Sequence, residues 1–142
     1  MKVLVATDGS KHALRAVKHA AALLANNKDK TNSVTLISVH DDAGLRHAQS
    51  FVGKAAITDY LREESDKDLK SAMKVLNDAG IKHDQIILVG KPAIEIVAAA
   101  QKGKYDLVVL GSKGRNAVSD LLLGSVAQRV MSLSKQSVLL VK

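Results

Sequence analysis

The feature that most constrains this chain is a regular alternation of short apolar segments with amphipathic ones. Segments rich in β-branched and aliphatic residues predict five buried strands, at 2–7, 34–40, 85–89, 106–110 and 137–141. Because these strands are apolar on both faces, their sheet needs cover on both sides. The alternation therefore predicts a parallel sheet between two layers of helices.

The segments between the strands carry the expected helices. Apolar residues recur every three or four positions over 11–26 and over 55–79, and shorter helices are expected at 92–102 and 125–133. In the long helix the apolar stripe runs through Leu61, Leu69, Ala72, Leu76 and Ala79, while the charged run 62–70 reads as a solvated face. Residues 41–54 include two glycines and read as a loop that could act as a lid and is expected to be mobile without ligand.

This order of elements predicts an α/β fold. Right-handed crossovers give an open, doubly wound, five-stranded parallel sheet with strand order 3-2-1-4-5 and helices on both faces, a Rossmann-like arrangement. The sequence contains no internal repeat and no interdomain linker. We therefore expect residues 1–142 to form one domain.

Composition excludes several classes of protein. The chain has no cysteine, so disulfides, thiolate metal sites and thiol catalysis are ruled out. It has no apolar run long enough for a membrane helix and no signal-peptide pattern, and we expect a soluble cytoplasmic protein without membrane association.

The net charge of +7 indicates anionic partners. Residues 82–142 hold nine basic and four acidic side chains, against twelve and ten in residues 1–81. The three aromatic residues, Phe51, Tyr60 and Tyr105, make no stacking platform, and nothing resembles a recognition helix. The sequence thus argues against a nucleic-acid module, which a salt-dependent DNA retention test would detect.

Ligands of open α/β sheets bind beyond the carboxyl ends of the strands. Two such ends are chemically rich here. The first strand runs into Ala6, Thr7, Asp8, Gly9 and Ser10, and the fourth runs into the segment 111–115. Asp8 or Ser10 can cap the following helix. A carboxylate beside phosphates would be repelled, so if Asp8 contacts a nucleotide, it faces the ribose or the base.

The second strand end has a distinctive glycine spacing. Gly111 is followed after two residues by Gly114, and after nine more by Gly124 and Ser125. Glycines allow close approach of a ligand, and a helix starting at Ser125 offers free N–H groups to an anion. Lys113 and Arg115 add positive charge. The pattern predicts a phosphate cradle, although the same residues could serve only as turns and a cap.

Other candidate chemistry is weaker. The five histidines show no zinc spacing, and no serine has a histidine and an acid at a recognised motif spacing. His40 lies at a strand end near Asp8, where it could touch a ligand or fill a loop. Asp41 and Asp42 read as solvated loop residues. We predict no catalytic residue and no protein metal ligand.

Taken together, three segments resemble the universal stress protein family. They are Val3–Ser10, Val89–Ala93 and Leu107–Arg115, and the last strand, Ser137–Val141, also fits. The resemblance covers essentially the whole chain. The glycine spacing is similar to the pattern of the family's ATP-binding subgroup.

The resemblance implies specific contacts. Asp8 looks like the acid that contacts adenosine, with Ala6 and Thr7 in the same pocket, and Val39 looks like the residue that meets adenine through its backbone. The implied phosphate shell is Gly111, Gly114, Gly124, Ser125 and Val126. The implied cofactors are ATP and Mg²⁺, with the ion held mainly by phosphates. Segment 40–54 follows no family pattern.

The expected function is that of an ATP-binding regulatory protein of the stress response. The alternatives are a slow ATPase or phosphotransfer enzyme, and a binder of AMP or a cyclic nucleotide. The sequence shows a cradle but no residue to position water, so any hydrolysis should be slow.

The last strand also predicts a partner. In the expected strand order it lies at the sheet edge, and Val138–Val141 is apolar on both faces without a charge inside it. Pairing with the same strand of a second copy would satisfy its backbone. The sequence therefore predicts a homodimer through Val138–Val141, as the family resemblance also implies, against the alternative of an edge covered within a monomer.

Overall fold

A single five-stranded sheet organises the molecule. The computed structural model describes residues 1–27, 29–115 and 122–142. The strands are β1 (Lys2–Ala6), β2 (Ser33–Asp41), β3 (His83–Gly90), β4 (Leu107–Gly111) and β5 (Ser137–Val141). All neighbours are parallel, in the order β3-β2-β1-β4-β5. The predicted fold class and strand order are confirmed.

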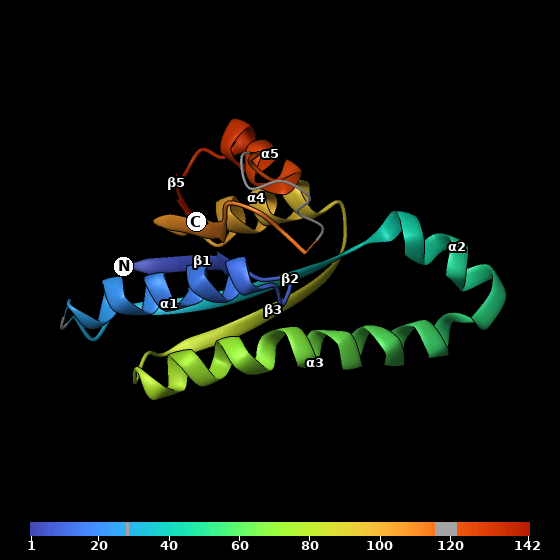
Figure 1. The fold of residues 1–142 in the computed structure, drawn as a ribbon, viewed down its shortest axis with the longest axis horizontal. Helices are drawn as coiled ribbons and strands as arrows, with labels where there is room; N and C mark the ends of the chain where they lie inside the picture. The colour runs from blue at the N-terminus through green and yellow to red at the C-terminus, as the bar shows by residue number, and fades with distance from the viewer. Residues whose placement is uncertain (28, 116–121) are drawn as a thin grey trace.

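The helices cover both faces of this sheet. They are α1 (Lys11–Ala25), α2 (Asp42–Val52), α3 (Lys54–Asp78), α4 (Pro92–Lys102) and α5 (Ser125–Leu133). Figure 1 shows α4 and α5 on one side of the strands and α3 on the other. No helix within the described residues combines the length and the apolarity needed to cross a bilayer.

Two apolar cores explain why the strands are apolar throughout. Val3, Val5 and Leu36 point to one face and pack with α1 and α3, including Val17 and Leu76. The alternate residues of the same strands point to the opposite face: Leu4, Ile37 and Val108 pack there with Ile96 of α4 and Val130 of α5. Strands β1, β2, β4 and β5 thus contribute to both cores, since successive side chains alternate across a sheet, whereas the edge strand β3 contributes only Ile86 and Leu88 to the second core.

The central position of β1 creates the crevice expected of this topology. β1 pairs with β2 on one side and with β4 on the other. The chain passes from β1 to β2 and then to β3 at one edge of the sheet. It then returns past β1 to β4 and β5 on the other side. The connections on the two sides of β1 therefore run in opposite directions. A crevice opens at such a switch point, beyond the carboxyl ends of β1 and β4.

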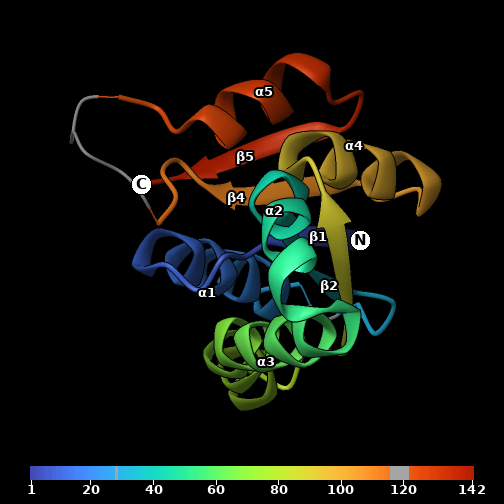
Figure 2. The same ribbon diagram turned by 90° about the vertical axis from the view of Figure 1, so that its right-hand side faces the viewer.

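Residues 42–52 form helix α2, so the predicted loop at 41–54 is wrong. Asp41 caps the helix, because its Oδ1 accepts a hydrogen bond of 2.9 Å from the Ala43 N–H. The break lies at Gly53, whose φ of 81° separates α2 from α3. Figures 1 and 2 show α2 at the far end of α3, beyond the end of β2. The expected mobility of this segment without ligand stays a prediction.

Replacing the α2 cap should loosen this helix without unfolding the sheet. In Asp41→Ala the Ala43 N–H loses its acceptor, and a lost cap destabilises a helix by about 1 kcal/mol. Hydrogen exchange should accelerate at residues 43–46, while the control Asp59→Ala, an exposed residue of α3, leaves it unchanged. Unchanged exchange in Asp41→Ala would show that the cap contributes nothing to α2.

Candidate functional site

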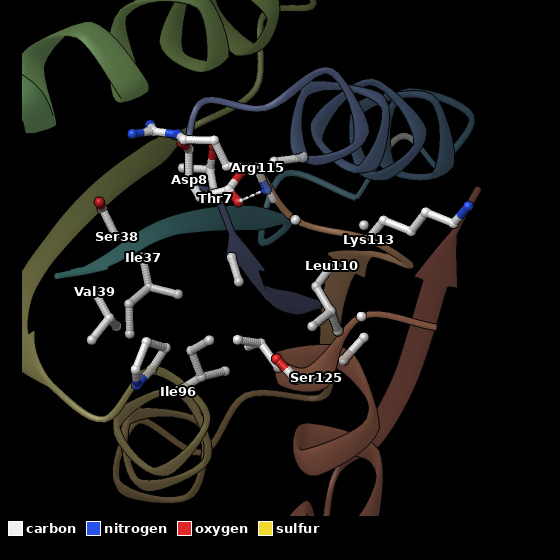
Figure 3. A pocket seen from close by; sticks show the side chains of 18 of the residues that line it. Thr7, Asp8, Ile37, Ser38, Val39, Ile96, Leu110, Lys113, Arg115 and Ser125 are labelled. Atoms are coloured by element: carbon white, nitrogen blue, oxygen red, sulfur yellow. Dashed lines mark hydrogen bonds between the residues drawn. The ribbon is translucent and has the colours of Figure 1, made fainter. Parts of the chain in front are cut away.

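A pocket of about 570 Å³ lies at the crevice. Its walls come from the ends of β1, β2 and β4 and from the first turns of α4 and α5. Figure 3 shows this pocket from close by. All the sequence-predicted site residues line it: Ala6, Thr7, Asp8, Val39, Gly111, Lys113, Gly114, Arg115, Gly124, Ser125 and Val126. The two strand ends singled out in the sequence therefore meet at one cavity.

One half of the pocket is apolar. In Figure 3 the side chains of Ile37, Val39, Ile96 and Leu110 surround an open space, with Ser125 near its lower rim. β2, α4 and β4 supply these side chains. A flat apolar group, such as the face of a nucleobase or another ring, fits such a surface.

The glycines bring the other half together through close packing. The Gly124 N–H donates a 2.7 Å hydrogen bond to the Ser112 carbonyl. A Cβ on Gly124 would lie 3.2 Å from the Lys113 Cα, and one on Gly111 would lie 2.8 Å from the backbone carbonyl carbon of His12. Among the described glycines, positive φ is found at Gly9, Gly53 and Gly80 but not at Gly111 or Gly124. Lack of space, and not unusual backbone geometry, therefore excludes a side chain at 111 and disfavours one at 124.

Helix α5 begins at this packed loop. Its N-cap is Gly124, and within the described part of the chain no side chain caps its first turn. The N–H groups of that turn have no intrahelical acceptor. Because they lie at the pocket wall next to the Gly111–Gly114 segment, the site offers several backbone donors to an anion.

Asp8 connects the end of β1 to the glycine loop. Its Oδ1 accepts from the Ser10 N–H at 2.9 Å, and its Oδ2 accepts from the Arg115 N–H at 2.9 Å. Ser10, and not Asp8, caps α1, because the Ala13 N–H donates to Ser10 Oγ. Of the two residues proposed as caps, Ser10 has that role. Asp8 lines the pocket and holds two segments of its wall together.

The two predicted phosphate cations lie at the margins of the pocket. The Arg115 guanidinium donates to the Asp8 carbonyl oxygen and, at 2.6 Å, to Asp68 Oδ1 of α3. Lys113 extends away from the apolar side chains in Figure 3. The donors best placed for an anion are therefore backbone N–H groups.

Two residues of α3 that the sequence reading placed on a solvated face lie at the site. Ser65 is fully buried, and its Oγ is 2.6 Å from His40 Nε2. Asp68 lines the pocket, and its side chain is 11% exposed. Ser65 lies four positions before Leu69, in line with the apolar stripe of the helix. A polar residue within this stripe was the sequence signal that Ser65 is buried.

The surroundings of these groups shift their protonation. Burial lowers the pKa of His40, and this outweighs the negative charges of Asp68 and Glu64, which act in the opposite direction. Burial also raises the pKa of Asp68, in spite of its ion pair with Arg115. Both shifts favour uncharged groups at this end of the pocket.

Comparison with known proteins places the chain in a family. The model of the Universal stress protein family matches residues 1–142. This chain belongs to the universal stress protein family. Universal stress protein MJ0531 of Methanocaldococcus jannaschii is 36% identical over 141 residues, which cover 99% of this chain and 81% of that protein. Universal stress protein MJ0577 of the same organism is 32% identical over 155 residues, covering 99% and 94%.

Solved structures of the family share the fold. The structure described as a structure-based assignment of the biochemical function of MJ0577 superimposes with a TM-score of 0.85 at 34% identity, covering 99% of this chain and 94% of that one. A universal stress protein in complex with cAMP gives a TM-score of 0.73 at 30% identity, covering 100% and 97%.

The lowered pKa of His40 predicts an acid-sensitive contribution to stability. Below its ordinary pKa of about 6.5 the unfolded chain binds a proton that the folded protein resists, so stability falls as pH drops through this range. Between pH 8 and pH 5, the unfolding free energy measured with urea should fall more for the wild type than for His40→Gln. Parallel profiles would show that His40 does not contribute.

Proposed function

We propose that this universal stress protein is a regulatory protein of the stress response that holds Mg-ATP at the carboxyl ends of β1 and β4. One observation carries the proposal: the uncapped first turn of α5 packs against the glycine loop at the wall of an apolar pocket. Backbone donors beside an apolar surface suit a ligand with a flat ring at one end and phosphates at the other.

The geometry suggests how the nucleotide lies. The base would pack against Ile37, Val39 and Ile96, with the Val39 backbone at its edge. The ribose would lie toward Ala6, Thr7 and Asp8, whose carboxylate is held in place by two N–H groups.

The phosphates would lie at Gly111, Gly114 and Gly124, and at the first N–H groups of α5, from Ser125 and Val126. Lys113 and Arg115 add positive charge at the margin of the same wall. Among the described residues no three His, Asp or Glu side chains gather into a metal site. A Mg²⁺ ion would therefore depend on phosphate oxygens and water, as this hard cation often does.

A related protein supports the class of ligand. The neighbour solved with cAMP is 30% identical and superimposes over the whole of this chain. AMP and cyclic nucleotides are accordingly the alternatives to ATP in this pocket. Calorimetric titration with ATP, AMP and cAMP would rank them, and we expect ATP in the presence of Mg²⁺ to bind most tightly, because its additional phosphates can reach the α5 donors.

The same geometry favours binding over rapid turnover. Fast phosphoryl transfer requires a group that orients water and a cation that neutralises the transferring phosphoryl group. Asp8 accepts two backbone hydrogen bonds, and the Arg115 guanidinium is paired with Asp68. We therefore propose at most slow hydrolysis of the bound ATP.

A single methyl group at Gly124 should separate binding from folding. In Gly124→Ala the Cβ would lie 3.2 Å from Lys113 Cα and 3.3 Å from the Ser112 carbonyl oxygen, so the loop and the helix start must move apart. Wild-type protein at about 100 times its Kd for Mg-ATP should gain roughly 2.7 kcal/mol of stability. Gly124→Ala should lose most of this gain, measured by thermal unfolding with and without Mg-ATP.

The control for this experiment is Ala55→Val, an exposed change in α3 that should keep the full gain. Absence of any Mg-ATP effect on the wild type would remove the proposed function. An intact effect in Gly124→Ala would instead remove the phosphate cradle.

We also propose a homodimer through β5. Within the described residues β5 pairs only with β4, which leaves its outer edge unpaired. Val138–Val141 is only half-buried, and the neighbouring helix α5 exposes Met131 and Leu133. Pairing of two β5 strands about a two-fold axis would satisfy this edge and cover the apolar side chains beside it.

A charge in β5 should disrupt such a dimer. Leu140→Lys places an ammonium group in the half-buried strand, where pairing would bury it, and sedimentation equilibrium should then show monomer or aggregate. The wild type should have twice the mass of the 15.1 kDa chain at tens of micromolar. A wild-type mass of one chain would contradict the dimer, and Gln136→Lys, just before the strand, serves as the control.

A further inference from the structure

Arg115 holds the end of β1 in two ways. Its backbone N–H donates to Asp8 Oδ2, and its guanidinium donates to the Asp8 carbonyl oxygen. The same nitrogen of the guanidinium lies 2.6 Å from Asp68 Oδ1 on α3. Arg115 therefore connects three elements: the turn after β1, the glycine loop after β4, and the long helix.

The turn after β1 is shaped to admit this contact. Gly9 has a φ of 76°, and a Cβ at this position would collide with Asp68 Oδ1 and lie 3.2 Å from Arg115 Nη2. The ion pair thus lies directly over the Gly9 backbone. Figure 3 shows Arg115 beside Asp8 at one end of the pocket.

The ion pair is asymmetric in its surroundings. The Asp68 side chain is 11% exposed and that of Arg115 is 53% exposed, while Glu64 Oε2 is 4.0 Å from Arg115 Nη1. Burial raises the pKa of Asp68 in spite of the arginine, so an ionised Asp68 costs the folded state free energy. A carboxyl group whose pKa is shifted by burial, at the wall of a pocket, is typical of functional sites.

We propose that Asp68 is a positioning residue for nucleotide binding, because it holds the Arg115 guanidinium across the Asp8–Gly9 turn and so fixes the glycine loop relative to the end of β1. This inference rests on the proposed function of the pocket. Gly114 depends directly on this placement, since a Cβ there would lie 3.1 Å from Asp8 Oδ2. Asp68 itself does not contact the nucleotide phosphates.

If Asp68 and Arg115 had a different role, the change in ATP affinity on removing the Asp68 charge would have the opposite sign. If Arg115 were a phosphate ligand that Asp68 withholds, removing the Asp68 charge would release the guanidinium and tighten binding, more for ATP than for AMP. If Asp68 positions the loop, removing its charge weakens binding. The direction of the change therefore decides between the two roles.

The experiment measures ATP and AMP affinity by titration calorimetry in Asp68→Asn, Arg115→Gln and the double variant. We expect each single variant to lose about ten-fold in ATP affinity, in keeping with one charge-assisted hydrogen bond, and the double variant to lose no more than either. The control Asp78→Asn removes an exposed carboxylate of the same helix, paired with Lys74 at 2.7 Å, and should bind like wild type. Unchanged or tighter binding in Asp68→Asn, or additive losses in the double variant, would overturn the proposal.

A measurement without ligand separates this inference from the proposed function. Hydrogen exchange at the Ser10 and Arg115 amides should be faster in Asp68→Asn than in wild type and unchanged in Asp78→Asn. The unfolding free energy of Asp68→Asn should equal or exceed that of the wild type. Equal exchange in all three proteins would overturn the positioning role even if the wild type binds ATP. If Asp68→Asn exchanges faster than the wild type but the wild type binds no nucleotide, Asp68 still positions the loop, whereas the proposed function is overturned, and with it the role of Asp68 in binding.

Discussion

Burial of β1 on all sides is the constraint on which the rest of the structure depends. Val3, Leu4 and Val5 are inaccessible to solvent, with β2 and β4 along the two edges of β1 and helices over both faces. A strand in this position can meet solvent only at its ends. The polar residues Thr7 and Asp8 follow immediately after the strand, so they line the crevice.

The same constraint explains how much of the fold was predictable. Strands buried on two faces leave a continuous apolar signal, and the order of elements then restricts the connections to few possibilities. Helix α2 was missed because its signals conflict: Gly44 lies inside it, and the cap is Asp41, which also belongs to β2. The edge strand β3 was read as buried throughout, yet Ile87 and Val89 are exposed because no helix covers them fully.

The candidate site was predictable where its residues are close in sequence to a strand end. The spacing from Gly111 to Gly124 correctly brought the loop and the α5 start to one wall. Side-chain direction was not predictable, since Arg115 turns toward an acid 47 residues earlier in the chain. The acid, Asp68, belongs to a helix rich in charged residues. The local sequence distinguishes it from Asp66 only by the side of the helix on which it lies.

Helix α3 extends far beyond the pocket that Asp68 lines. Asp68 lies fourteen positions after Lys54 at the start of the helix, and at the rise of an α-helix this corresponds to about 21 Å. The segment beyond the pocket carries α2 and the exposed side chains of Phe51 and Tyr60. Because of this length, a tilt of α3 about Asp68 would displace Phe51 and Tyr60 farther than it displaces the side chains at the pocket.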